Sequence, residues 1–146
     1  MKLKFIFLGK SDPKLVSSLV EKYLKRLNNY VKSELLFLSE KNPIKLDKKI
    51  AKYIKNRTHL VVLDEHGTLK DTVQYTKFIQ KRISNHETLI FVVGDAYGIP
   101  LQLVDRADSI LSLSKMTFPH LIARLILIEQ TYRAFTILNN HPYHHE

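Results

Sequence analysis

Short, almost continuous apolar runs recur along this sequence and limit the folds that it can adopt. The first is LKFIFLG at residues 3–9, and HLVVLDE at 59–65 and TLIFVVG at 88–94 are similar. Runs of this length without polar alternation suit strands that are buried on both faces, as in a parallel sheet. SELLFLSE at 33–40 and SILSLS at 109–114 are interpreted as two further strands.

Segments with helical periodicity separate these runs. Apolar side chains recur at helical spacing within residues 11–30, where Ser11 or Asp12 is predicted to cap a helix and Pro13 suits its first turn. Asp71 or Thr72 is the expected cap of a later helix. Strands that alternate with helices predict one α/β domain over residues 1–146, with a mostly parallel sheet and flanking helices. The other helices are predicted over 46–56, 71–84 and 100–107 and from Pro119 onward.

The charge balance points to a polyanionic partner. The chain has 23 Lys and Arg against 14 Asp and Glu, a net charge of +9, which favours nucleic acid. A generally basic surface is the alternative. The absence of Cys excludes disulfides and thiolate zinc sites. No apolar stretch reaches the ~18 residues of a membrane span, and no signal peptide is recognised, so a cytoplasmic location is expected.

The glycines indicate where a ligand binds. Gly9, Gly67, Gly94 and Gly98 each follow a predicted strand end, with Gly67 in a turn. Ligands of parallel sheets bind outside the carboxyl ends of the strands, and glycine permits close backbone approach. Neither a dinucleotide fingerprint nor a phosphate loop is present. A ligand with an adenine and a ribose, but without a di- or triphosphate, is therefore favoured.

The segment LSKMTF at 113–118 can supply such a ligand with both backbone contacts and apolar walls. Leu113, Met116 and Phe118 could wall a purine ring. Ser114 and Thr117 could bond its polar parts or cap the helix that begins at Pro119. In the alternative interpretation Met116 and Phe118 are core residues and Thr117 is only a cap.

The whole chain resembles the ribosomal large-subunit pseudouridine methyltransferases, which are SPOUT-class enzymes with an α/β-knot. The resemblance lies in VVLDEHG, in FVVGDAYG, and above all in LSLSKMTFPH with the following RLILIEQTYRA and HPYH. It implies a deep C-terminal trefoil knot and S-adenosyl-L-methionine as methyl donor. It also implies a homodimer with packed C-terminal helices, and methylation of ring nitrogen 3 of a pseudouridine in 23S ribosomal RNA on assembled ribosomes. Neither a metal nor a covalent nucleophile is required.

The resemblance also implies the cofactor contacts. In place of the two successive glycines frequent in the family, this chain has GDAYG, where Asp95 adds a charge and Tyr97 precedes Gly98. That departure puts the pose of the methionine end in question. The implied contacts are Leu63, Gly94, Leu113, Ser114, Lys115, Met116, Thr117 and Phe118.

The tail HPYHHE is the candidate catalytic segment. The target nitrogen must lose a proton, and a His with a pKa near ~6.5 could accept it. The hypothesis is that Tyr143 and His144 help to form the pocket for the target base, with Tyr143 stacking on that base. A frayed terminus and a metal-binding His cluster are the alternatives, and no metal site is predicted.

The long C-terminal helix carries two arginines with different expected roles. Arg124 and Arg133 lie about two and a half turns apart and therefore face opposite sides. One is predicted to reach RNA phosphate and the other to pair with Glu129 or a partner subunit. The helix is apolar nearly all round, which favours packing against a second copy, with complete burial inside one chain as the alternative.

Two other functions and one surface question stay open at this point. The chain could be a SPOUT enzyme that acts on transfer RNA, or a non-catalytic module that binds RNA or the ribosome. The Lys-rich segments at 45–57 and 77–82 could face phosphate or could be solvated helix faces.

Overall fold

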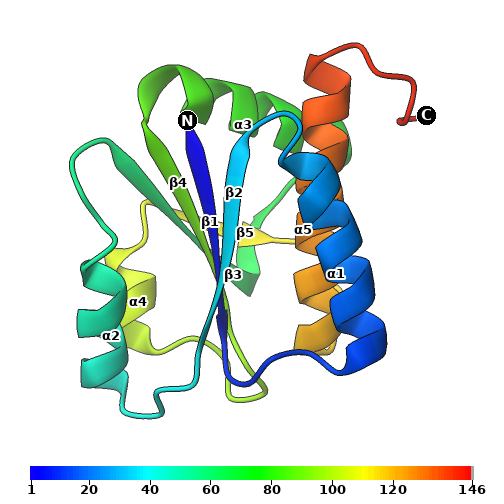
Figure 1. Ribbon diagram of the computed structural model, residues 1–146. Helices are drawn as coiled ribbons and strands as arrows, with labels where there is room; N and C mark the ends of the chain where they lie inside the picture. The colour runs from blue at the N-terminus through cyan, green and yellow to red at the C-terminus, as the bar shows by residue number, and fades with distance from the viewer. Residues whose placement is uncertain (146) are drawn as a thin grey trace.

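The computed structural model describes residues 1–145, in which parallel strands form the centre of the molecule (Figure 1). The strands pair in the order β2-β1-β4-β3-β5, and every pairing is parallel, so the carboxyl ends share one edge of the sheet. The predicted α/β class with a parallel sheet is confirmed. The strands are β1 (Lys2–Leu8), β2 (Lys32–Leu38), β3 (Thr58–Leu69), β4 (Thr88–Val93) and β5 (Ser109–Ser112).

Helices cover both faces of this sheet (Figure 1). One core lies between the sheet and the layer of α1, α3 and α5, and a smaller core lies between the sheet and α2 with α4. The chain therefore has three layers, as the alternation of strands and helices predicts. The helices are α1 (Lys14–Leu27), α2 (Pro43–Ala51), α3 (Thr72–Asn85), α4 (Leu101–Arg106) and α5 (His120–Leu138).

The apolar strands supply both cores because successive side chains point to opposite faces. In β1, Phe5 and Phe7 face the larger core, whereas Ile6 lies in the smaller one. The rings of Phe5 and Phe91 stack with their centroids 5.3 Å apart. Burial on both faces explains why these strands read as continuous apolar runs.

The helix starts confirm one predicted cap and contradict another. Asp71 caps α3 in a capping box, in which its side chain accepts from the backbone N–H of Gln74 at 2.7 Å. The prediction that Ser11 or Asp12 caps α1 is wrong, since the N-cap of α1 is Pro13 and no side chain bonds there. Asp12 is drawn away by a buried ion pair with Arg124, described below.

The turn predicted at Gly67 is also wrong, because β3 continues to Leu69. A bulge interrupts the β3–β5 pairing, in which both Leu63 and Thr68 align with Leu111. The bulge keeps the chain in the sheet, and a Cβ on Gly67 would lie 2.7 Å from the carbonyl oxygen of Ile110. Gly67 therefore serves close strand packing and is not part of the strand-end loops.

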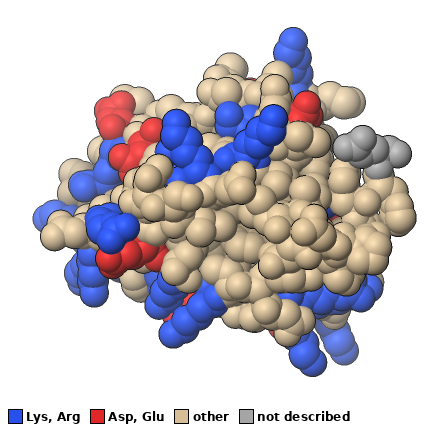
Figure 2. Space-filling model, turned by 90° about the horizontal axis from the view of Figure 1, so that it is seen from above, with Lys and Arg blue, Asp and Glu red and all other residues tan. Residues whose placement is uncertain are grey.

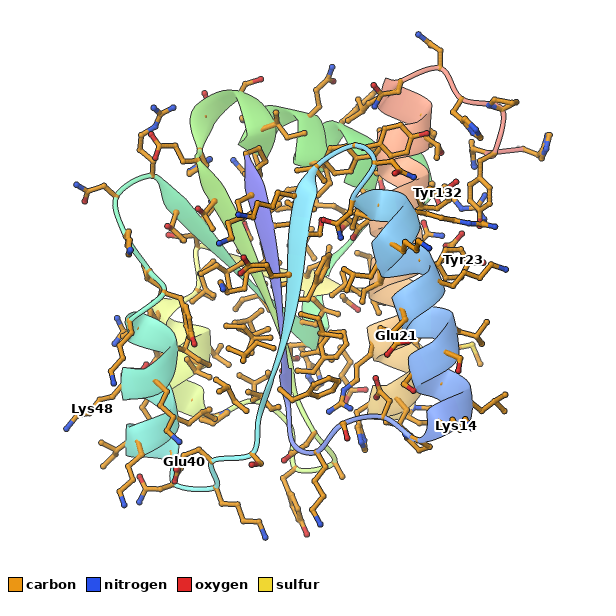
Figure 3. All side chains as sticks on the ribbon, viewed as in Figure 1. Lys14, Glu21, Tyr23, Glu40, Lys48 and Tyr132 are labelled. Carbon is orange, nitrogen blue, oxygen red and sulfur yellow. The ribbon has the colours of Figure 1, made fainter. Side chains whose placement is uncertain are left out.

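Helix α5 lies between two helical neighbours. It contacts both α1 and α3, and Tyr132 of α5 faces Tyr23 of α1 with their ring centroids 5.9 Å apart (Figure 3). Much of its apolar surface is thus buried within one chain. Leu15 and Leu19 of α1 and Ile122 of α5 are nevertheless exposed, so burial inside one chain is incomplete.

Candidate functional site

A cavity of about 440 Å³ opens at the bulge in β3 and at the carboxyl ends of β4 and β5. Leu63, Val93 and Leu111 contribute one apolar residue from each of these strands. Further walls come from Asp64 and Glu65, from residues of the loop 94–99, from the segment 113–120 apart from Lys115, and from Ala123 of α5. The volume falls in the range of small-molecule sites, and the position is where a parallel sheet binds ligands.

Every residue predicted to contact the cofactor lines this cavity except Lys115, which is exposed. Met116 is 74% exposed and stands at the mouth, so its interpretation as a core residue is wrong. Phe118 is half-buried. The lining residues from the prediction are Leu63, Gly94, Leu113, Ser114, Met116, Thr117 and Phe118.

Ser114 and Thr117 do not cap α5. The N-cap of α5 is Pro119, and no side chain bonds there. The hydroxyl of Thr117 donates instead to Glu65 at 2.7 Å, and the hydroxyl of Ser114 accepts from the backbone N–H of Met116 at 2.9 Å. These two bonds shape the 113–118 loop and tie it to the end of β3.

The cavity is acidic although the protein is basic. Asp64, Glu65 and Asp95 line it, whereas no Lys or Arg of residues 1–145 does. In a chain of net charge +9, this arrangement favours a cationic ligand. The sequence analysis did not identify Asp64 and Glu65 as site residues. Their position directly after an apolar strand run was the available signal, because parallel strands place such residues at the ligand-binding edge.

The loop GDAYG forms a closed turn at the cavity. A Cβ on Gly94 would lie 2.8 Å from the backbone of Gly98, and Gly98 has φ +83°, so both positions require glycine. The carboxylate of Asp95 accepts from the backbone N–H of Tyr97 at 2.8 Å. Tyr97 is 96% exposed and does not line the cavity. The departures from the family pattern are thus accommodated within an ordered turn.

Arg124 holds the loop after β1 in place. Its guanidinium is 1% exposed and donates to the carboxylate of Asp12 at 2.7 Å and to the carbonyl oxygen of Leu8 at 2.6 Å. The loop after β1 is thereby held beside the cavity, where a Cβ on Gly9 would lie 3.4 Å from the Cβ of Asp95. Because Arg124 is buried in this pair, it does not reach RNA phosphate.

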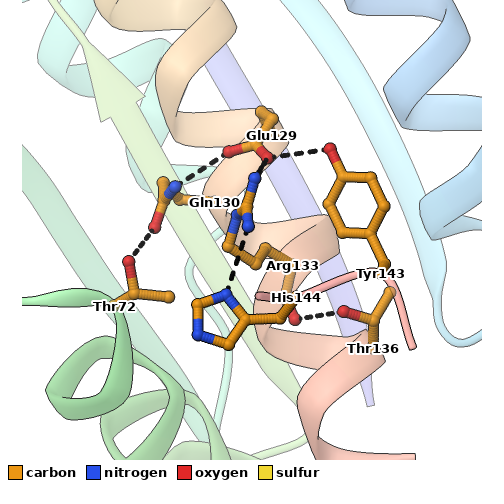
Figure 4. A network of polar contacts seen from close by, with 7 residues as sticks. All are labelled: Thr72, Glu129, Gln130, Arg133, Thr136, Tyr143 and His144. Carbon is orange, nitrogen blue, oxygen red and sulfur yellow. Dashed lines mark hydrogen bonds and ion pairs between the residues drawn. The ribbon is translucent and has the colours of Figure 1, made fainter. Parts of the chain in front are cut away.

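Arg133 makes the ion pair that was predicted for one of the two arginines. Its guanidinium donates to Glu129 at 2.6 Å, and the hydroxyl of Tyr143 donates to the same carboxylate oxygen at 3.0 Å (Figure 4). The Tyr143 ring also lies 4.8 Å from the Arg133 guanidinium. Burial and the nearby Glu129 charge raise the pKa of Tyr143, which therefore stays protonated. The tail is thus packed against α5, and its interpretation as a frayed terminus is wrong for Tyr143 and His144.

Arg133 fixes the tautomer of His144. The guanidinium donates to Nδ1 of His144 at 3.1 Å (Figure 4). Because Arg has only donors, Nδ1 must be the accepting nitrogen, and a neutral ring carries its proton on Nε2. In this arrangement Nε2 is a hydrogen-bond donor and not a base.

The tail and the cavity lie at different levels of α5. Ala123 lines the cavity, whereas His144 contacts Arg133, and ten residues of helix between them span about 15 Å. Neither Tyr143 nor His144 lines the cavity of the same chain. The structure therefore places the predicted cofactor residues together and the predicted catalytic residues elsewhere.

Two other classes of site have no counterpart in residues 1–145. No group of three His, Asp or Glu side chains there could hold a metal ion, and no helix is both long and apolar enough to cross a membrane. Lys and Arg are dispersed over the face seen in Figure 2 and do not gather in one patch. Charge alone therefore does not mark a nucleic-acid surface on that face.

Comparisons with known proteins agree with this geometry. Residues 1–144 match the family model described as predicted SPOUT methyltransferase. A "Ribosomal RNA large subunit methyltransferase H" of Christiangramia forsetii is 40% identical over 156 residues, with 99% of each chain covered. One of the same name from Flavobacterium johnsoniae is 38% identical, with both chains fully covered.

Solved structures confirm the fold at much lower identity. The crystal structure of a probable methyltransferase from Bordetella pertussis Tohama I superposes with a TM-score of 0.59 at 12% identity. The superposition covers 91% of this chain and 93% of that chain. Together with the full-length relatives, these findings show that the chain belongs to the SPOUT methyltransferase family.

Proposed function

We propose that this protein uses S-adenosyl-L-methionine to methylate ring nitrogen 3 of a pseudouridine in 23S ribosomal RNA, the pseudouridine-1915 type of activity. The observation that carries the proposal is the cavity at the strand ends, which is lined by seven of the eight residues that the family resemblance implies as cofactor contacts. The names of the full-length relatives, which specify ribosomal RNA of the large subunit, support the substrate.

The cavity suits the cofactor in shape and in charge. Leu63, Leu111 and Leu113 offer apolar surface for an adenine ring, and the backbone of 113–118 offers donors and acceptors. S-adenosyl-L-methionine carries a positively charged sulfonium, and the carboxylates of Asp64 and Asp95 line the same cavity. After transfer the sulfur is neutral, so these carboxylates favour the methyl donor over its demethylated product.

The sulfonium supplies an already activated methyl group, so the protein must mainly hold the target nitrogen in line with it. We assign Tyr143 and His144 to the pocket for the target base. While Arg133 donates to Nδ1, the Nε2–H of His144 donates a hydrogen bond to a carbonyl oxygen of the base and orients the ring. A role for His144 as the proton acceptor requires that this contact with Arg133 be broken.

A homodimer accounts for the separation between cavity and tail. The exposed apolar side chains Leu15, Leu19 and Ile122 on α1 and α5 provide a surface for a second copy. In a two-fold dimer built on these helices, the tail of each chain completes the cavity of its partner. This arrangement brings Tyr143 and His144 to the cofactor in the partner's cavity. Within one chain they could reach the cofactor only if part of α5 unwound.

Three further expectations belong to the same proposal. The enzyme acts on the assembled ribosome in the cytoplasm, and the chain threads a C-terminal trefoil knot, as the family resemblance implies. A SPOUT enzyme that acts on transfer RNA is the alternative, disfavoured by the names of the relatives. A non-catalytic RNA-binding protein is disfavoured by the ordered GDAYG turn, since Asp95 does not disrupt the cavity.

Methyl transfer to defined ribosomes tests the function. Ribosomes from cells that lack this enzyme are incubated with tritiated S-adenosyl-L-methionine, and the labelled nucleotide is mapped by mass spectrometry. Label on N3 of one 23S pseudouridine is expected. Label confined to transfer RNA, or no label from a protein that binds the cofactor, would refute the proposal.

Mixing two variants tests the shared site, at a cofactor concentration too low for Met116→Glu to bind. A chain without residues 141–146 has an intact cavity, and a Met116→Glu chain has an intact tail. If tails complete partner cavities, randomly mixed dimers should recover about a quarter of the parental activity, because half of them contain one intact site out of two. If each site is formed by one chain, the mixture stays inactive.

A further inference from the structure

A second hollow, of about 600 Å³, lies at the β5 edge of the sheet beside α3. Lys70, Phe78, Arg82 and Ser109 are among the residues that line it. We propose that this hollow binds a backbone phosphate of the RNA substrate, next to the nucleotide that is methylated. The inference rests on the proposed function and adds a specific RNA contact to it.

Two positive charges converge in the hollow. The Lys70 ammonium lies 5.5 Å from the centroid of the Phe78 ring, and the Arg82 guanidinium lies 4.7 Å from the same centroid. Within residues 1–145, neither has a carboxylate partner within 4.0 Å. The carboxylate in the hollow, Asp108, accepts from the backbone N–H of Leu60 at 2.8 Å. Both cations therefore remain available to an anion.

Two buried side-chain atoms, one of them on the lining residue Arg82, lack hydrogen-bond partners among the residues that the structure describes. Arg82 Nε and His86 Nδ1 are buried without a hydrogen bond in the described part of the chain. A buried donor without an acceptor costs free energy. Because Nε is enclosed by protein, an RNA phosphate in the hollow would instead accept charge-assisted hydrogen bonds from the outer guanidinium nitrogens of Arg82. Neighbouring His59 is already engaged, since its Nε2 lies 2.8 Å from the hydroxyl of Ser109.

The hollow lies close to the cofactor cavity. A third depression, of about 340 Å³, shares Lys70 with the hollow and shares Leu113 and Phe118 with the cavity. Leu111 lines all three. A polymer whose target base enters the cavity can therefore reach the hollow with a neighbouring nucleotide. That proximity favours an RNA backbone over a free phosphate ion.

Two other basic residues of α3, Lys77 and Lys81, differ from Arg82 in their surroundings. Lys77 and Lys81 are exposed and line none of these depressions, so they form a solvated helix face. Arg82 differs because its guanidinium packs on Phe78 inside the hollow. Of the predicted basic segment 77–82, only Arg82 is therefore assigned to phosphate.

The test compares Lys70→Gln and Arg82→Gln with the matched control Lys81→Gln. Affinity for unmodified ribosomes is measured by filter binding over a series of salt concentrations, and affinity for S-adenosyl-L-methionine by calorimetry. Both hollow variants should weaken ribosome binding about tenfold and lower the salt slope by about one unit. Their affinity for the cofactor should match that of the parent, and Lys81→Gln should bind ribosomes as the parent does.

Three outcomes separate the possibilities. Equal ribosome affinity of all variants, with Lys70→Gln folded by circular dichroism, would overturn the inference. Weaker binding to ribosomes with unchanged binding to protein-free 23S RNA would overturn it too, because an acidic ribosomal protein would then occupy the hollow. Weaker binding to both supports the inference. This holds even if no methyl transfer is found, in which case the proposed function alone fails.

Discussion

Arg124 and Arg133 lie on the same helix, yet they belong to different parts of the molecule. Arg124 is fully buried and joins α5 to the loop after β1 through Asp12 and Leu8. Arg133 is partly exposed and joins Glu129 to the tail residue His144. The N-terminal half of α5 is thus part of the framework beside the cavity, whereas its C-terminal half holds the tail that we propose for the target-base pocket. Residue type and helix position alone do not distinguish these two roles.

Removal of the tail should give the largest loss of activity. It should leave the part of the molecule around Arg124 and the cavity unchanged. Deletion of residues 141–146 is expected to reduce methyl transfer to ribosomes by about 1000-fold or more, because the target-base pocket is lost. Calorimetric affinity for S-adenosyl-L-methionine should be unchanged. His145→Ala is the control, since that residue is exposed. Full activity of the truncated chain would end the assignment of Tyr143 and His144.

Arg124→Met should act at the other end, on stability. It leaves the carboxylate of Asp12 buried and unpaired, which is expected to lower the free energy of unfolding by about 3–5 kcal/mol. Urea denaturation measures this loss. Arg106→Met is the matched control, because Arg106 pairs with Asp47 at the surface and should cost about 1 kcal/mol or less. Adding Asp12→Asn should restore part of the loss, and equal costs for the two arginines would contradict burial of the pair.

Arg133→Gln should separate activity from stability. The variant loses the ion pair with Glu129 and the contact with the Tyr143 ring, so tail and base are misplaced. A decrease of about 100-fold in kcat is expected, with a stability loss of about 1 kcal/mol. Stopped-time methylation assays and urea denaturation measure the two quantities. A stability loss as large as that of Arg124→Met, with unchanged kcat, would reverse the comparison.

The pH dependence of stability tests His59 of β3, which contacts neither Arg124 nor Arg133, and so serves as a reference for the comparison. Burial, with a smaller effect of the Arg82 charge, lowers the pKa of His59 to about 4 from 6.5. Between these values the unfolded chain binds a proton that the folded chain does not, so stability falls as pH decreases through this window. The expected loss of stability across this window is at most about 3 kcal/mol, at about 1.4 kcal/mol per pKa unit, and it is absent in His59→Gln. The same dependence of stability on pH should appear in Arg133→Gln. If His59→Gln kept the pH dependence of the parent, the assignment of this effect to His59 would be refuted.

The sequence was sufficient for the elements that depend on local patterns. Continuous apolar runs predicted the parallel strands, and the segment 113–118, which was predicted to hold a ligand, lines a cavity with all its residues except Lys115. The Asp71 cap was predicted correctly because a capping box forms within one helical turn. Such features are determined by neighbouring residues, which the sequence displays directly.

Long-range pairing explains what the sequence analysis missed. Asp12 looked like a cap, but Arg124, 112 residues away, offers a buried charge that no local pattern reveals. Asp64 and Glu65 lie where the pairing of β3 with β5 is bulged, so the apolar run before them was only a partial signal of their place in the cavity. The distance between tail and cavity likewise depends on how the chain folds back along α5.

The most direct test of the central claim is calorimetric titration of the parent and of Met116→Glu with S-adenosyl-L-methionine. Met116 is 74% exposed at the cavity mouth, so the substitution leaves the folded protein intact. Met116 is assigned to the wall of the adenine ring and not to the sulfonium, so a carboxylate there would lose water on cofactor binding without gaining a partner. Binding by the parent with a tenfold or greater loss in the folded variant is expected, at about 1.4 kcal/mol per tenfold. Equal binding by both would place the cofactor elsewhere, and no binding by the parent would contradict the assignment of the cavity.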